Sequence, residues 1–288
     1  MPQTINTNLN SLNAQRALNM SQASLATSMQ RLSSGMRVNS AKDDAAGLAI
    51  AERMNSQVRG MNVAARNAND GISMAQTAES ALGKVADALQ RMRELAVQAA
   101  NATNSGGDKD SLDKEFGELA KEVQRVLGGT SFNGKHMLGA EAGTLSFQIG
   151  ANTGSNDVLE VITTDLTADS TITGVAGTDN TGAGRAVIDS SANAAQMRTV
   201  MDNIDTALGN ISGQRATMGA SQSRFESVIS NLQASVESQT AARSRIMDAD
   251  FAAETASLSR AQILQQAGNA MVAQANQLPQ QVLKLLQG

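Results

Sequence analysis

The two ends of this 288-residue chain are patterned alike, and this similarity constrains the fold more than any other feature. Each end carries few charges and sets widely spaced aliphatic side chains among Asn, Gln, Ser and Ala. Steps of mostly three, four and seven residues place each set on one narrow stripe of an α-helix, as in a coiled coil. The stripe residues are Ile5, Leu9, Leu12, Leu25 and Leu32 at the front, and Leu264, Met271, Leu278, Val282 and Leu285 at the back.

A single helix with so narrow an apolar stripe is marginal in water, because it cannot bury the stripe by itself. We therefore expect the two ends to pack on each other or on the ends of further copies of the chain. The stripes together form a predicted polymerisation seam, which is typical of a structural subunit and not of an enzyme.

The composition favours long, thin helical packing. Aromatic residues make up 2% of the chain, with no Trp or Tyr, and the two prolines, Pro2 and Pro279, leave residues 3–278 free of the strongest helix breaker. The net charge of −4 argues against binding to nucleic acid or to a membrane surface, and no apolar run is long enough to insert into a membrane. The first 25 residues show no Sec-type signal, so any export is expected to use another route.

Helical periodicity is strong on both sides of a glycine-rich middle. Apolar residues predict helices over 82–99 and 112–126, and one phase holds from 197 to 246, which is roughly 75 Å of helix. The expected fold is mainly α, a long antiparallel coiled-coil-like rod built from both chain ends. We expect an inner domain of 1–43 plus 248–288, and an outer domain of 44–247 with a β-hairpin and loops at about 128–190.

The middle of the chain gives a hairpin signal. Residues 144–149 alternate apolar and polar side chains, and 157–162 are rich in β-branched residues, which predicts two paired strands. Residues 169–184 contain many Gly, Thr and Asp, so we expect an exposed and replaceable loop there.

Local structural roles such as helix capping account for most of the conspicuous polar residues, with no need for a catalytic or metal-binding role. Gly35 is expected to end a helix, and Asn39 or Ser40 to cap the next one. Lys42, Asp43 and Asp44 are interpreted as charges at a helix start, and His136, the only histidine, as a solvated loop residue. We expect no catalytic site, metal or cofactor, because the sequence has no second histidine for a triad, no metal-ligand cluster and no phosphate-binding loop.

Several segments resemble bacterial flagellin, in its order and spacing. They cover both flanks, roughly 1–140 and 190–288, and the middle is the short form without large outer domains. The matching segments are QRLSSG at 30–35, NSAKDDAAGLAI at 39–50, NANDGIS at 67–73, LQRMRELAVQ at 89–98, SFNG at 131–134 and the run LSRAQILQQAGNAMVAQANQLPQQVLKLL at 258–286.

The resemblance implies a structural subunit that self-assembles into the helical flagellar filament, the propeller for bacterial swimming. It implies an extracellular location, reached without a cleaved signal peptide through the flagellar export apparatus. An export chaperone and the filament cap and hook-junction proteins are the other implied partners. The alternative is a component of the hook–filament junction, which would share the terminal pattern.

The resemblance also implies a surface patch on the predicted helix through 89–98. An innate immune receptor of animal hosts reads this segment on flagellin monomers, and the same surface is buried between subunits in the filament. The matching positions are Arg91, Leu95 and Gln98, with Glu115 from the next helix. Leu95 is expected to lie off the stripe that packs within the chain, and the alternative is that it belongs to a wider helix–helix packing face.

Overall fold

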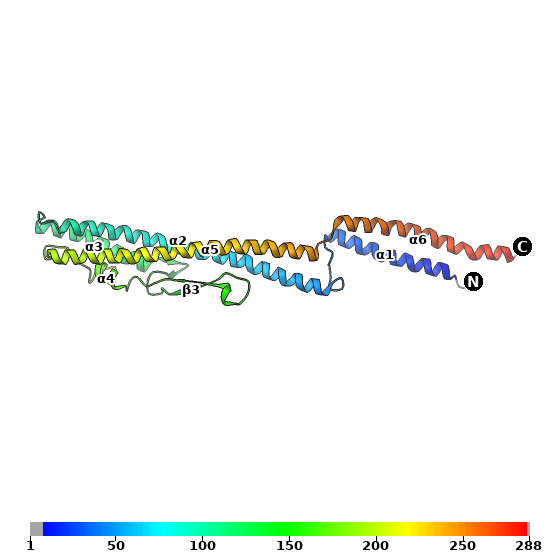
Figure 1. Ribbon diagram of the computed structural model, residues 1–288, viewed down its shortest axis with the longest axis horizontal. Coiled ribbons are helices and arrows are strands. Elements are labelled where there is room, and N and C mark those ends of the chain that lie inside the picture. The colour runs from blue at the N-terminus through cyan, green and yellow to red at the C-terminus, as the bar shows by residue number, and fades with distance from the viewer. Residues whose placement is uncertain (1–7, 287–288) are drawn as a thin grey trace. The chain divides into compact units, whose positions relative to one another are not determined.

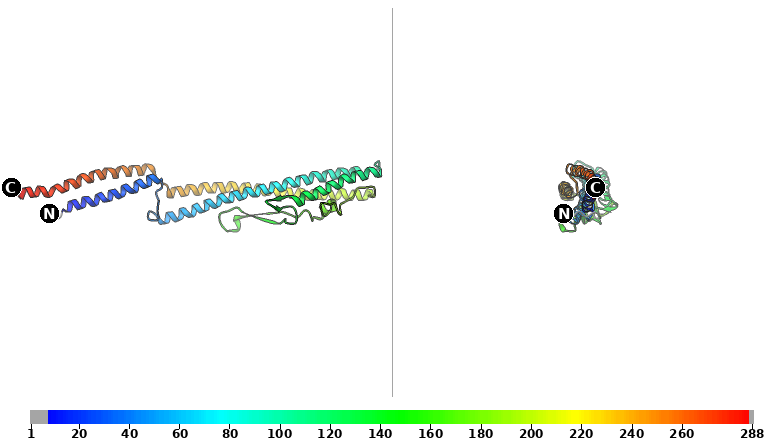
Figure 2. Two further views of the ribbon diagram at one scale, coloured as in Figure 1. Left: turned by 180° about the vertical axis from the view of Figure 1, so that it is seen from behind. Right: turned by 90° about the vertical axis from the view of Figure 1, so that its right-hand side faces the viewer.

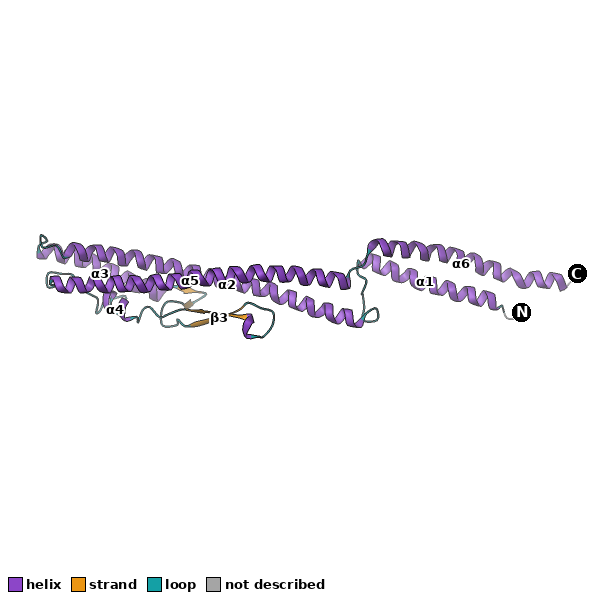
Figure 3. Cartoon of the chain, in the orientation of Figure 1, coloured by secondary structure: helices purple, strands orange, loops and turns teal. Residues whose placement is uncertain are grey.

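The computed structural model describes the backbone of residues 8–286 and the side chains of residues 8–277 (Figure 1). The described part is mainly helical, as predicted, and contains two small antiparallel sheets (Figure 3). The helices are α1 (Leu9–Ser34), α2 (Ala45–Ala99), α3 (Gly106–Gly129), α4 (Ser170–Ala176), α5 (Ala194–Met247) and α6 (Phe251–Leu286), and the strands are β1 (Ser131–Phe132), β2 (Lys135–His136), β3 (Thr144–Gln148) and β4 (Val158–Ile162).

The chain divides into two compact units, each built from segments of α2 and α5 and their neighbours. The terminal unit comprises Met1–Ser56 and Glu237–Gly288, and the bundle unit comprises Gln57–Val236. The expected domain boundaries at 43/44 and 247/248 fall at the breaks before α2 and after α5, whereas the compact units divide within those helices. The two-domain division with those boundaries stays a prediction.

In the bundle unit, α2 and α5 run antiparallel and are linked by polar side chains. Arg93 on α2 donates two hydrogen bonds to Asp205 on α5, at 2.6 and 3.1 Å. Glu79, four turns earlier on α2, accepts a hydrogen bond from Gln222 at 2.9 Å. The predicted uninterrupted helix through 197–246 is confirmed, because α5 spans 54 residues without a break.

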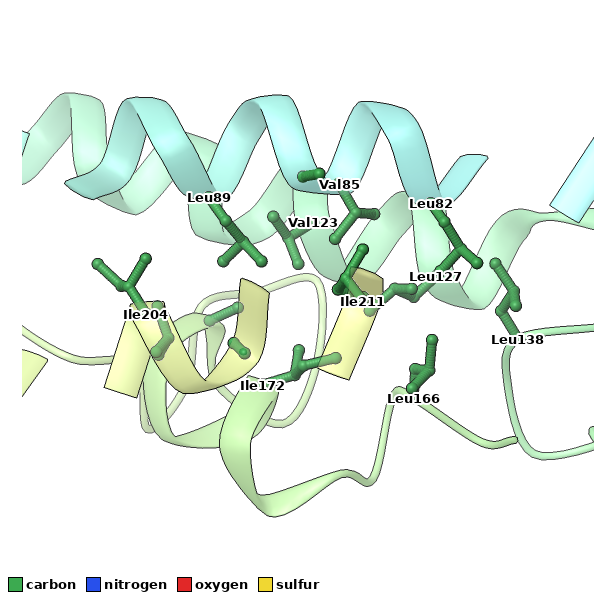
Figure 4. Close-up of a cluster of buried hydrophobic side chains, with 14 of the residues drawn as sticks. Leu82, Val85, Leu89, Val123, Leu127, Leu138, Leu166, Ile172, Ile204 and Ile211 are labelled. Carbon is green, nitrogen blue, oxygen red and sulfur yellow. The ribbon is translucent and has the colours of Figure 1, made fainter. Parts of the chain in front are cut away.

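The core of the bundle unit is a continuous cluster of buried, mainly aliphatic side chains (Figure 4). Burial of each such side chain stabilises the fold by about 1.5–3 kcal/mol, so this core is the main source of stability in the unit. The labelled core residues are Leu82, Val85 and Leu89 from α2, Val123 and Leu127 from α3, Ile204 and Ile211 from α5, Ile172 from α4, and Leu138 and Leu166 from the connections.

The predicted hairpin of the middle segment is confirmed. β3 and β4 pair antiparallel, in a register that runs from Thr144↔Ile162 to Gln148↔Val158. A short 3₁₀ turn, Ser155–Asp157, leads directly into β4. One face of the hairpin is therefore turned toward the helices, with Leu159 and Val161 buried.

The β3–β4 hairpin packs at a point where α2 and α5 approach each other closely. Phe225 of α5 lies against Gly71 of α2, where an added Cβ would come within 2.5 Å of the ring. Phe147 of β3 meets the same ring edge to face, with 5.3 Å between the ring centroids. Asn67 of α2 donates a hydrogen bond at 2.9 Å to the carbonyl of Gln148, which fixes the end of β3 on the helix.

The segment 163–193, which we call the strap, corrects the expectation of an exposed loop at 169–184 for residues 169–177, whereas 178–184 form a largely exposed loop. Within the strap, Asp169 caps α4, and Ile172, Val175 and Ala176 are completely buried in the core. Their spacing of three and four residues gives one turn of apolar helix face. The expectation was wrong because the surrounding Gly and Thr residues masked a helix of only seven residues.

A partly buried ion pair ties the strap to α3. Arg185 donates to both carboxylate oxygens of Asp113, at 2.9 and 2.5 Å, and the Ile188 N–H donates to Asp113 at 2.9 Å. Burial alone would raise the pKa of Asp113, but the hydrogen bonds from Arg185 and Ile188 outweigh it and lower that pKa. Both side chains are shielded from solvent, so their loss would leave a buried partner unpaired.

A second hairpin was not predicted. β1 and β2 pair through Ser131↔His136 and Phe132↔Lys135, joined by the two-residue turn Asn133–Gly134. An Asn-Gly pair is the strongest short-range signal for such a turn, and it was present in the sequence. The interpretation of His136 as a solvated loop residue was wrong, because it is a half-buried strand residue whose Nδ1 atom has no partner among the described residues.

Candidate functional site

The terminal helices α1 and α6 lie side by side and antiparallel within the terminal unit (Figure 1, Figure 2). Their buried contact surface consists of small side chains: Ser11, Ser21 and Ser28 on α1, and Ala261 and Ala275 on α6. Each of these removes little apolar area from water, so the pairing gains far less hydrophobic free energy than the bundle core does.

Polar contacts define how the two terminal helices align. Ser11 donates a hydrogen bond to Asn276 at 2.7 Å, and Asn8 donates to the carbonyl of Ala275 at 2.7 Å. At the other end of the pair, Arg31 and Glu254 approach to 3.9 Å. Polar contacts of this kind specify register and contribute little stability, as polar positions do in coiled coils.

The larger aliphatic side chains of both helices point outward. Met20 is 70% exposed, Leu9 63%, Ile263 65% and Met271 60%. Between the helices runs an apolar groove of 990 Å³. The groove is lined by Asn10, Asn13, Ala14, Ala17, Met20, Ser21 and Ser24 of α1 and by Leu264, Ala267, Gly268, Met271, Gln274 and Ala275 of α6.

The structure separates the predicted seam residues into two groups. Leu25 and Leu32 are half-buried between α1 and α6, whereas Leu9, Leu12, Leu264 and Met271 are exposed. Ile5 and the side chains of Leu278, Val282 and Leu285 lie outside the described residues. The chain thus uses small residues for its internal pairing and leaves most of the aliphatic stripe uncovered.

Sequence reasoning missed the small-residue face and the exposed Met20 and Ile263. The signal was present in part, since Ser11, Ala14, Ser21 and Ser28 share a regular three–four spacing with Leu18, Leu25 and Leu32 on α1. A search for large aliphatic side chains alone finds the leucines of this face and passes over its Ser and Ala positions.

In the terminal unit, hydrogen bonds join the break between α1 and α2 to the break between α5 and α6. Gly35 ends α1 in the left-handed conformation, with φ of 69°, as predicted. The Arg37 N–H donates to the Met247 carbonyl at 2.6 Å, and its guanidinium donates to the Ile246 carbonyl at 2.7 Å. A small apolar cluster of Val38, Ala51 and Met247 closes the joint.

The start of α2 corrects another expectation. Asp44, not Asn39 or Ser40, precedes the helix and accepts a hydrogen bond from the Gly47 N–H at 2.7 Å. Asp43 accepts from the backbone N–H groups of Asn39 and Ser40, which lower its pKa. Both carboxylates are used in turns, and the described residues contain no cluster that could hold a metal ion.

The predicted surface patch lies where α2 meets α3. Arg91, 49% exposed at its side chain, donates to Glu115 of α3 at 2.9 Å and to Glu94 at 2.8 Å, and both acids raise the pKa of Arg91. Gln98 is also exposed. Leu95 has no exposed surface and belongs to the bundle core, so the expectation that it lies off the packed stripe was wrong.

Both features describe a helical structural protein made for association: two terminal helices with an uncovered apolar face, and a well-packed bundle. None of the described helices is long and apolar enough to cross a membrane. Residues 5–142 match the bacterial flagellin N-terminal helical region, and residues 201–286 match the bacterial flagellin C-terminal helical region.

Relatives match over the whole length. A flagellin of Halalkalibacterium halodurans is 44% identical over 285 residues, covering 98% of this chain and 99% of the relative. Flagellin A of Vibrio anguillarum is 36% identical over 377 aligned positions, with 99% of both chains covered, so it carries residues that this chain lacks. A crystal structure of Bacillus cereus flagellin is 32% identical, covers 58% of this chain and 88% of its own, and has a TM-score of 0.48.

The chain belongs to the bacterial flagellin family. It is a structural subunit of the flagellar filament. The filament is extracellular and serves motility. A junction component is not favoured, because both terminal regions and the full-length relatives are flagellins.

Proposed function

We propose that the subunit polymerises by burying the outward aliphatic face of α1 and α6 against neighbouring copies. The observation that supports this is the arrangement of the described part of the terminal pair, in which only Ser and Ala side chains are fully buried and most Leu, Ile and Met side chains are exposed. A row of exposed aliphatic side chains on a soluble protein usually marks an association surface. The predicted seam, including Ile5, Leu278, Val282 and Leu285, is part of this proposal.

Assembly then completes the folding of the terminal helices. The internal contact between α1 and α6 is made by small residues, and ordering each residue costs about 1–2 kcal/mol of backbone entropy. The missing stabilisation comes from the neighbouring subunits, since each Leu, Ile or Met that becomes fully buried contributes about 1.5–3 kcal/mol. Polymerisation is therefore coupled to ordering of the chain ends.

Two aspartate substitutions in the groove test the assembly surface. Leu264→Asp combined with Met271→Asp places charges on the exposed face, and burying them would cost several kcal/mol. We expect seeded filament growth, followed by electron microscopy and sedimentation, to stop while the monomer keeps its helix content.

The matched control carries the same charges elsewhere on α6. Ser259 and Gln266 are exposed but do not line the groove, so Ser259→Asp with Gln266→Asp should leave growth far less affected. Normal filaments from the groove variant would contradict the proposed surface, and equal loss in both variants would show only a general effect of charge.

The remaining partners are proposed from the family. The flagellar export apparatus with an export chaperone delivers the subunit, and the filament cap and hook-junction proteins contact the polymer. Weakly self-packed ends support this, because a chain that gains its last order on assembly loses little by remaining unfolded before it. We propose no catalytic activity, in keeping with a structural family.

We propose a second role for the patch of Arg91, Gln98 and Glu115, as a contact for neighbouring subunits and for an innate immune receptor of animal hosts. The exposed Arg91 guanidinium supports it, because Arg is frequent among residues that dominate interfaces. Leu95 takes part only as a core residue that holds this turn of α2 in place.

Arg91→Ala tests this second role against Arg93→Ala, a control of the same residue type two positions along α2. The Arg91 variant should lower receptor signalling by the monomer and reduce swimming. The Arg93 variant loses a comparable surface ion pair and should change signalling much less. Wild-type signalling by the Arg91 variant would contradict the receptor proposal without affecting the filament assignment.

A further inference from the structure

The β1–β2 turn contains the only Asn-Gly pair of the sequence. Asn133 has φ of 51° and is the one non-glycine residue with positive φ among the described residues, and Gly134 has φ of 80°. Both residues are exposed, and apart from Gly134 itself and its two chain neighbours no residue has an atom within 4 Å of the point where a Cβ on Gly134 would stand. In the described part of the chain, the Gly134 N–H makes no backbone hydrogen bond outside the strands.

An Asn-Gly pair can undergo deamidation without an enzyme. The Gly134 backbone nitrogen, after losing its proton to water, attacks the side-chain carbonyl carbon of Asn133. A new C–N bond closes a five-membered succinimide ring, and the side-chain nitrogen leaves as ammonia. Water then opens the ring at one of its two carbonyl groups, giving aspartate or isoaspartate. Glycine permits the attack because it has no Cβ to obstruct its nitrogen.

The folded turn holds the reacting atoms apart. Ring closure needs the Gly134 nitrogen to eclipse the Asn133 side chain across the Cα–C bond. In a type I′ turn, with ψ of about 30° at the first central residue, the nitrogen is rotated by about 150° from that side chain. The positive φ values of both residues are those of a type I′ turn. The ring can therefore close only after the turn has opened.

We propose that Asn133 is a deamidation site whose reactivity depends on folding. The folded hairpin protects Asn133, and aspartate or isoaspartate accumulates at this position while the chain is unfolded. The two products differ in consequence. Asp-Gly also favours the type I′ turn, so aspartate is tolerated on refolding. Isoaspartate adds one atom to the backbone, which shifts the Phe132↔Lys135 pairing and pulls on Met137 and Leu138, both buried directly after β2.

Mass spectrometry of the full-length subunit tests this inference. Folded protein and urea-unfolded protein are incubated at the same neutral pH and temperature, and the peptide containing residue 133 is assayed for Asn, Asp and isoAsp. We expect conversion at least about tenfold faster in the unfolded chain, since a factor of ten needs only about 1.4 kcal/mol of turn-opening free energy.

Two controls make the outcome specific. Asn62, which precedes Val63 inside α2, reports in the same digests on background deamidation and should stay unconverted in both states. Asn133→Asp should refold with the stability of the wild type, whereas purified isoaspartyl chains should be less stable. Equal conversion at Asn133 in folded and unfolded protein, or conversion no faster than at Asn62 in the unfolded chain, would overturn the inference.

Discussion

The terminal pair of α1 and α6 and the bundle unit are both helical, but they bury opposite kinds of side chain. The bundle encloses Leu, Val, Ile and Phe and keeps most of its ion pairs at the surface, such as that of Arg93 with Asp205, with the partly buried Arg185–Asp113 pair as the exception. The terminal pair fully buries only Ser and Ala among its described residues and exposes most of its Leu, Ile and Met side chains. The bundle has a large apolar core of its own, whereas under the proposed assembly the terminal pair gains its missing stability from other copies.

The strap provides the largest test of the bundle side of this comparison. Replacing residues 169–182 with a Gly-Ser linker removes the buried Ile172, Val175 and Ala176, and each large side chain lost costs about 2–5 kcal/mol. We expect urea denaturation to show severe destabilisation or loss of the folded bundle. The same replacement at the exposed residues 152–155 should have little effect, and equal stability of both variants would mean that the strap is dispensable.

A pair of leucines compares the two regions directly. Leu89→Ala in the bundle core should lower the free energy of unfolding by about 2–5 kcal/mol. Leu264→Ala on the terminal helix should change it by less than about 0.5 kcal/mol in the monomer, because that side chain is already exposed to solvent. In filament assembly Leu264→Ala should instead have the larger effect of the two substitutions, and it should raise the critical concentration for growth. A large decrease in the free energy of unfolding of the Leu264→Ala monomer would refute the assignment of Leu264 to an exposed face of α6.

Acid provides a smaller and more local test, through Asp113. The pKa of this carboxyl is lower in the folded chain than its usual value of 3.8, so its pairing with Arg185 stabilises the fold above that value. This contribution, about 1–3 kcal/mol for hydrogen bonds to a charged group, is lost as the pH falls through the folded pKa.

Asp113→Asn isolates the effect from the other acids nearby, Asp110 and Asp189. The difference in unfolding free energy between wild type and variant should be constant above about pH 5 and should shrink below the usual pKa. A difference that does not vary with pH would show that Asp113 is not the titrating group.

The sequence predicted those parts whose stabilisation is local and periodic. The continuous phase through 197–246 gave α5, and alternation at 144–149 gave β3. The strap helix α4 was missed because its seven residues derive their stability from tertiary burial and not from propensity.

The candidate site was predicted in part, and the errors share one cause. Leu95 was placed off the packed stripe because a two-helix seam is narrow, whereas α2 packs on both α3 and α5 and therefore buries a wider face. On α1 and α6 the aliphatic pattern marked side chains that are mostly exposed in the monomer, but it did not mark the buried Ser and Ala residues that pair the two helices. Hydrophobic periodicity shows which face of a helix tends to become buried. It does not show whether that face packs within its own chain or against another subunit.

Amide hydrogen exchange, measured on the dilute monomer and on the filament, tests the central claim most directly. We expect residues 9–34 and 251–277 to exchange quickly in the monomer and to become strongly protected in the filament, while the core turns of α2, α3 and α5 are protected in both. Strong protection of both terminal helices in the dilute monomer would contradict the claim that their stability comes from neighbouring subunits.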